Sequence, residues 1–136
     1  MTKESKDIRW KQRLQNYTKA LAQLESGLEV KNPDILQKQG IIQCFEYTFE
    51  LAWKTLQDFL IQERGYADAK RPRPVLEQAF QDGIIKDGLG WFVMLKSRNL
   101  TTHLYDEKEV EGICKKVAKK YRRLFVALRK FFEAQK

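Results

Sequence analysis

Apolar residues recur every three or four positions along nearly the whole chain, and this period restricts the fold more than any other feature. The first apolar stripe consists of Trp10, Leu14, Tyr17, Leu21, Leu24 and Leu28. Steps of four and three place these side chains on one face of an α-helix. The apolar–polar alternation of a β-strand is absent. We therefore predict an all-helical protein.

A second stripe predicts a helix with an unusually wide apolar face. It lies between the helix-stopping segment Asn32-Pro33-Asp34 and Gly65. Its members are Ile42, Phe45, Phe49, Ala52, Leu56 and Phe59, and the face is widened by Ile41, Cys44, Thr48 and Leu51. Because such a face needs cover from several sides, we expect this helix at the centre of the molecule.

The second half of the chain predicts two short helices and one long one. After the stiff Arg71–Pro74 loop, a short helix buries Val75, Leu76, Ala79 and Phe80 and stops at Gly83. The next runs from Leu89 to about Asn99 and is anchored by Trp91, Phe92 and Leu95. Asp106 and Glu109 resemble a capping box. They precede a last stripe of Val110, Ile113, Val117, Tyr121, Leu124, Leu128 and Phe131. The prediction is one domain, residues 1–136, folded as an antiparallel four- to five-helix bundle.

Composition excludes several classes of protein. No apolar run approaches the length of a membrane span, and the N-terminus lacks the apolar core of a signal peptide. The two cysteines form no CxxC pair, which is typical of a reducing cytoplasm. A single histidine excludes the common multi-histidine zinc sites, so we expect neither a metal nor a cofactor. The net charge of +8 favours a phosphate-rich or acidic partner, although a solvated lysine-rich surface is an equally good interpretation.

The sequence contains neither GxGxxG nor GxxxxGK[ST], so a dinucleotide-binding or nucleotide-hydrolysing loop is not expected.

Two further groups of residues, a pair of glutamates and the two cysteines, have simple structural interpretations. Glu46 and Glu50 are one helical turn apart, and we expect partly exposed charges that pair with Lys54. Cys44 and Cys114 lie on apolar stripes and are expected to be small core residues.

The junction between residues 96 and 106 is a candidate site of chemistry, because it contains the only histidine of the sequence, five positions after an arginine. On an unbroken helix Arg98 and His103 would point about 140° apart, and a break could bring them together. A guanidinium fits a phosphate, and an imidazole moves protons near neutral pH. These groups could cleave an RNA phosphodiester with the 2′-hydroxyl as nucleophile. From the residue types alone, a structural histidine near a helix cap is the more common interpretation.

The last predicted helix carries a basic face opposite its apolar stripe. Its members are Lys115, Lys116, Lys119, Lys120, Arg122 and Arg123. We expect Lys116, Lys119 and Arg123 to contribute to binding of RNA or of an acidic partner. The alternative is a face that is merely solvated.

Four segments resemble a known family. They are RWKQRLQNYTKALAQLESGL (9–28), FEYTFELAWKTLQDFL (45–60), PRPVLEQAFQDGII (72–85) and RNLTTHLYDE (98–107). Arg98-x4-His103-x-Tyr105 resembles the Rx4HxY motif of HEPN domains, in the branch of the HepT toxins and nucleotidyltransferase substrate-binding proteins. The resemblance implies a homodimeric helical bundle with two motifs facing a shared cleft. It also implies a minimal nucleotidyltransferase as the partner in a two-gene toxin–antitoxin-like module.

The resemblance also implies roles for individual residues. Arg98 and His103 would be the catalytic pair of a metal-independent ribonuclease, Asn99 a polar helper, and Tyr105 the site at which the partner adds an adenylyl group. Two other functions stay open. One is a non-catalytic accessory subunit that holds substrate for a nucleotidyltransferase. The other is a helical adaptor whose Arg98 and His103 only build the dimer.

Overall fold

The structure, a computed structural model, describes residues 2–67, 69–104 and 106–135, with side chains from Arg9 onward. The helices are α1 (Thr2–Leu28), α2 (Ile35–Arg64), α3 (Pro72–Gln81), α4 (Gly88–Leu100), α5 (Glu107–Lys116) and α6 (Arg122–Ala134). A 3-10 turn, η1 (Thr101–His103), follows α4, and a π-helical turn, η2 (Val117–Tyr121), joins α5 to α6. These ranges contain no strand, and the predicted all-helical bundle is confirmed.

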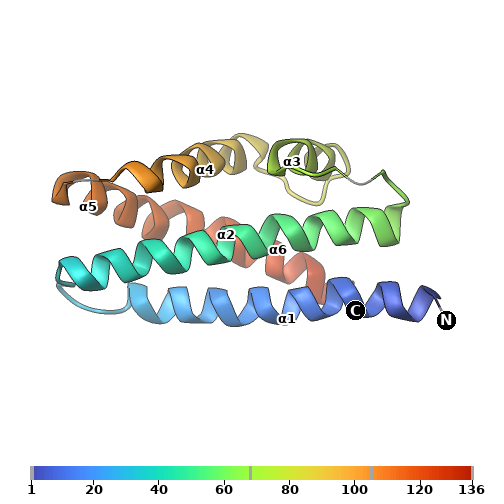
Figure 1. Ribbon diagram of the computed structural model, residues 1–136, viewed down its shortest axis with the longest axis horizontal. Coiled ribbons are helices and arrows are strands. Elements are labelled where there is room, and N and C mark those ends of the chain that lie inside the picture. The colour runs from blue at the N-terminus through green and yellow to red at the C-terminus, as the bar shows by residue number, and fades with distance from the viewer. Residues whose placement is uncertain (1, 68, 105, 136) are drawn as a thin grey trace.

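Helix α2 is the central element of the bundle. It runs antiparallel beside α1, and α5, η2 and α6 form one continuous helical path that crosses behind it (Figure 1). Helices α3 and α4 lie along the side of α2 away from α1 (Figure 1). Since α1, α3, α4, α5 and α6 all contact α2, the wide apolar face expected for this helix has the cover it needs.

Polar side chains cap the starts of α2, α4 and α5, and the sequence predicted the starts of α2 and α5. The Asp34 carboxylate accepts a hydrogen bond from the Gln37 backbone N–H, and the Gln37 side chain accepts one from the Asp34 N–H, which forms a capping box. Asp87 and Asp106 each accept a bond from a backbone N–H three residues later. Helix α2 ends at Gly65, whose φ of 71° is the left-handed conformation that glycine adopts without strain.

The core is aromatic and continuous from α1 to α6. Trp10, Phe45, Phe49 and Leu56 are buried, as predicted, and Trp53 is buried as well. Phe45 stacks on Tyr121, with ring centroids 5.6 Å apart. The buried Tyr17 hydroxyl donates a 2.6 Å hydrogen bond to the Phe125 carbonyl, so this polar group has a partner inside the core. Desolvation by burial raises the pKa of Tyr17 well above its usual value and keeps it neutral.

The prediction for the last helix is partly wrong after Tyr121. Leu128 is buried as predicted, but Phe125 and Phe132 are fully buried where Leu124 and Phe131 were expected. Leu124 and Phe131 are only partly buried, at the edge of the core. The cause is η2, because a π-helical turn takes up an extra residue and shifts the later side chains around the helix. A periodicity counted for an unbroken α-helix therefore predicts Leu124 and Phe131 as core residues, each one position before the residue that is buried.

Phe80 also differs from the prediction, because its side chain is 50% exposed. Its ring lies over Gly88 instead of entering the core. A Cβ atom at position 88 would be 2.8 Å from a carbon of that ring, so the close approach requires glycine. Phe80 thus covers the start of α4.

We expect Phe49→Ala to destabilise the protein by about 3–5 kcal/mol, because a fully buried phenylalanine leaves a cavity when it is truncated. Denaturant unfolding followed by circular dichroism measures the change in free energy. The matched control is Leu36→Ala, at a helical position that is 74% exposed, where about 0.5 kcal/mol or less is expected. Equal effects of the two substitutions would contradict the assigned core.

Candidate functional site

The segment that contains the predicted motif is a broken junction between helices. Helix α4 ends at Leu100, the 3-10 turn follows, and Asp106 caps the next helix. The break expected after Arg98 is therefore present. Arg98 lies in the last turn of α4 and His103 at the end of η1, so the break falls between them in the chain.

Two hydroxyl groups on either side of Arg98 fix the end of α4. The buried Ser97 and Tyr121 hydroxyls share a 2.6 Å hydrogen bond, which ties α4 to the π-helical turn. The Thr101 hydroxyl lies 2.5 Å from a Glu46 carboxylate oxygen and donates to it, which ties η1 to α2. Arg98 lies between these two anchors, which hold the end of α4 to both neighbouring elements and restrict its backbone.

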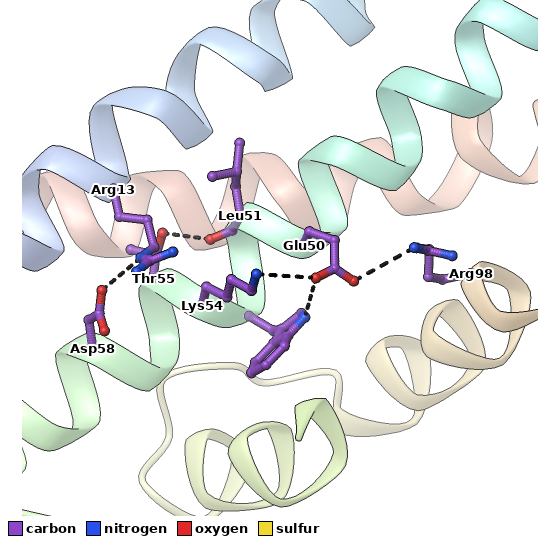
Figure 2. Close-up of polar contacts among 8 residues, drawn as sticks. Arg13, Glu50, Leu51, Lys54, Thr55, Asp58 and Arg98 are labelled. Carbon is purple, nitrogen blue, oxygen red and sulfur yellow. Dashed lines mark hydrogen bonds and ion pairs between the residues drawn. The ribbon is translucent and has the colours of Figure 1, made fainter. Parts of the chain in front are cut away.

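The Arg98 side chain lies between two glutamates of α2. Its guanidinium nitrogens are 3.7 Å from a Glu46 oxygen and 3.8 Å from a Glu50 oxygen, as Figure 2 shows for Glu50. These distances are those of ion pairs and are too long for hydrogen bonds. Its Nε is buried, and none of its N–H groups donates a hydrogen bond within the described residues. The arrangement holds a charged fork in place while its donors still lack acceptors.

Glu50 has further partners that the sequence only partly indicated. Its carboxylate is 3.8 Å from the Lys54 ammonium, as expected (Figure 2). It also accepts a 3.3 Å hydrogen bond from the Trp53 indole. The contacts of Glu46 and Glu50 with Arg98 were not predicted. The only sequence signal is their spacing of one turn on α2, which gives no information about which distant helix they face.

Asn99 has different neighbours from Arg98. It lines a surface groove of about 650 Å³ between α3 and α4, together with Lys96 and Phe92. Its predicted role as a polar helper of the catalytic pair is untested by these contacts. They place Asn99 beside the groove.

The other predicted residues are on the surface or outside the described part. His103 is exposed. Tyr105 lies outside the described residues, so its predicted position near the motif stays a prediction. Lys116, Lys119 and Arg123 are all exposed, on α5, η2 and α6 respectively.

The cysteines are partly buried thiols that pack against the core. Burial raises the pKa of Cys44, and it also raises the pKa of Cys114, whose thiol donates a weak hydrogen bond to the Lys38 carbonyl. A raised pKa keeps both groups protonated at neutral pH, so neither is an activated nucleophile. Within the described residues there is no group of three His, Cys, Asp or Glu side chains that could hold a metal ion.

The fold and the junction define a small helical-bundle protein with a clamped arginine at a helix break. The chain belongs to the family described as nucleotidyltransferase substrate binding protein like, whose sequence profile matches residues 12–134. No helix in the described ranges has both the length and the apolar character that a bilayer crossing requires.

Two relatives extend this comparison. A protein from Haemophilus influenzae named probable ribonuclease HepT is 31% identical over 87 residues, which is 60% of this chain and 60% of that protein. The match therefore spans less than two thirds of the relative. A crystal structure of a protein from Thermus thermophilus has a TM-score of 0.76 at 32% identity, covering 82% of this chain and 94% of the other.

Proposed function

We propose that the protein is a HEPN-type ribonuclease that cleaves RNA without a metal ion and is controlled by a minimal nucleotidyltransferase in a two-gene toxin–antitoxin-like module of the cytoplasm. The observation that carries the proposal is the Arg98 guanidinium, which is fixed at a helix break but donates no hydrogen bond within the described residues. The oxygens of a phosphodiester are suitable acceptors for such a fork. The name of the Haemophilus influenzae relative supports the same reaction.

The reaction uses groups that the RNA itself supplies. The 2′-oxygen forms a bond to phosphorus, the bond from phosphorus to the 5′-oxygen breaks, and the products are a cyclic phosphate and a 5′-hydroxyl end. A base removes the proton from the 2′-hydroxyl, and an acid gives a proton to the leaving oxygen. His103 serves in one of these roles, and Arg98 stabilises the charge that develops on the phosphoryl oxygens.

A two-fold dimer would supply a second copy of each group. One imidazole could then act as the base while the other acts as the acid. Symmetric dimers are the commonest oligomers, and a shared cleft explains how a motif of so few residues could suffice.

The alternative function is a non-catalytic accessory subunit that holds substrate for a nucleotidyltransferase. The family description favours this function. The two carboxylates beside Arg98 also favour it, because they neutralise the charge that a reacting phosphate would need. RNA cleavage by the purified protein separates the two functions.

We expect a dimer at micromolar concentration, since the proposed cleft needs two motifs. Sedimentation or light scattering measures the mass directly. A monomer that cleaves RNA would contradict the shared cleft, and a monomer without activity would favour the adaptor or accessory role.

His103→Ala and Arg98→Ala should each reduce RNA cleavage by about 10²–10⁴-fold, because each removes a group that acts in the transition state. Arg98→Lys keeps the charge but loses the planar fork, so it should fail as well. Cleavage is measured on a labelled RNA, with EDTA expected to have no effect. Lys130→Ala, at an exposed position, is the control that should retain full activity. Cleavage that persists in His103→Ala would overturn the assignment.

Replacing Lys116, Lys119 and Arg123 with Gln should weaken RNA binding and flatten its dependence on salt. Three lost phosphate contacts correspond to a reduction of about 2 in the logarithmic salt slope for a single strand. Fluorescence anisotropy over a range of salt concentrations measures both quantities. The matched control replaces Arg9, Lys31 and Lys130, which removes equal charge from other exposed positions. An unchanged slope would show that the basic face is only solvated.

Tyr105→Phe should keep ribonuclease activity but escape inactivation by the nucleotidyltransferase. The added nucleoside monophosphate is a bulky anion that would pair with Arg98 and exclude RNA by charge and by volume. Mass spectrometry after co-expression should find the added group on Tyr105. If the nucleotidyltransferase inactivates Tyr105→Phe to the same extent as the unsubstituted protein, the partner acts by forming a complex and not by modification.

A further inference from the structure

The groove between α3 and α4 is a large surface cavity with an asymmetric charge. Its walls come from Arg71 and the first half of α3 and from one face of α4, and its volume is about 650 Å³. The lining combines cations with one carboxylate and an apolar floor: Arg71, Arg73, Lys96, Glu77, Phe92 and Val93. Three positive groups face one negative group, so the groove favours an anion.

These three cations lack the carboxylate partners that five other arginines of the described residues have, whereas Arg9 and Arg123 also lack one. Within the described residues, no carboxylate lies at ion-pair distance from Arg71, Arg73 or Lys96. By contrast, carboxylates pair with Arg13, Arg64, Arg98, Arg122 and Arg129. Leaving like charges close together without counter-charges is unfavourable, and an anionic ligand would relieve this repulsion.

Phe92 gives the groove a second property. The Arg73 guanidinium lies 5.1 Å from the centre of the Phe92 ring, a cation–π contact that restricts the arginine while its N–H edges stay available. Phe92 is itself only partly buried. An aromatic ring beside cations is the combination with which proteins bind unpaired nucleotides, since bases stack and phosphates pair.

The start of α3 adds only a little to this charge. Its first turn contains no acidic residue, and Arg71 makes no side-chain cap. However, Pro72 and Pro74 lack backbone N–H groups, so half of the donors usually exposed at a helix start are missing. The attraction for an anion therefore comes mainly from the side chains.

The groove leads toward the junction that holds the proposed catalytic pair. Phe92, Lys96 and Asn99 follow one another along the same face of α4, and Asn99 adjoins Arg98 in the chain. A strand that binds along this face reaches the helix break at its end. A double helix hides its bases and could not use the aromatic floor.

We propose that this groove binds the phosphate backbone of single-stranded RNA and guides it to the Arg98–His103 junction. Arg71, Arg73 and Lys96 contact phosphates, and Phe92 contacts a base. The direction toward a cleavage site rests on the proposed ribonuclease function, whereas binding in the groove does not.

Binding is tested separately from cleavage, in a His103→Ala background. The triple variant Arg71→Gln, Arg73→Gln and Lys96→Gln should bind a labelled single-stranded RNA at least tenfold more weakly, with a salt slope lower by about 2. The control with Arg9, Lys31 and Lys130 replaced by Gln loses equal charge and should bind nearly normally. Glu77→Gln removes the carboxylate from the groove and should tighten binding severalfold. Circular dichroism verifies that each variant is folded.

The outcomes separate the groove from the catalytic assignment. Weaker RNA binding by the groove variant, but not by the control variant, supports the proposed RNA-binding groove. If the unsubstituted protein never cleaves RNA, the ribonuclease function is wrong, but this support for the groove is unaffected. Equal affinity of the groove and control variants overturns the groove while leaving cleavage open. Weaker binding after Glu77→Gln, or no RNA binding by the parent, also overturns it. If the groove variant keeps its affinity for RNA but no longer binds the nucleotidyltransferase, the groove is a protein-docking surface and the proposal is wrong.

Discussion

The cover of α2 by every other helix is the constraint on which the rest of the structure depends. A helix packed on several sides has few positions left for polar residues, and most buried polar groups need a partner. Thr48 and Thr55 solve this locally, since their hydroxyls donate to carbonyls one turn earlier. Asp58 solves it with Arg13 of α1 at 2.7 Å (Figure 2). Glu46 and Glu50 form ion pairs with Arg98 of α4, so the packing of α2 itself positions the candidate site.

The π-helical turn supplies the other half of that placement. It brings Tyr121 into the core, where the ring stacks on Phe45 and the hydroxyl meets Ser97. The same turn moves Phe125 and Phe132 inward. This change in helical register has two effects. It fills the core beside α1, and through the Tyr121 hydroxyl it holds Ser97, the residue before Arg98 in α4. Helix irregularities of this kind frequently accompany functional sites.

Local chemistry explains why the helices were predictable and why several contacts were not. The stripes of α1 and α2 and the caps at Asp34, Gly65 and Asp106 depend on neighbours within a few residues. The register shift at η2 depends on how the core as a whole is filled, so Leu124 was wrongly expected in place of Phe125. The ion pairs of Arg98 join segments far apart in the sequence, and periodicity has no information on such contacts.

The candidate site itself was found by residue type, and its surroundings were not. Arg98 and His103 stood out because the only histidine follows an arginine at a helix break, and Tyr105 entered through the family motif. Nothing in the sequence order shows that Lys96 and Asn99 share a groove with Arg71 and Arg73, because the approach of α3 to α4 creates that groove. Cavities depend on tertiary packing, and a single sequence reports only the side chains that line them.

The two sets of basic residues differ in a way that suits different tasks. Arg98 is positioned by two carboxylates, which hold it in place but weaken its attraction for a phosphate that arrives from solution. No described carboxylate lies at ion-pair distance from the groove cations, which in the proposal supply the attraction for phosphate, but they lie beside no histidine in the sequence. In the proposed function, affinity comes from the groove and reactivity from the junction. A chain bound along the groove presents its next phosphate to Arg98 at high effective concentration. Once that phosphate excludes water, the unbonded donors of the guanidinium gain their acceptors, and the ion pairs with Glu46 and Glu50 need only keep the fork in its orientation.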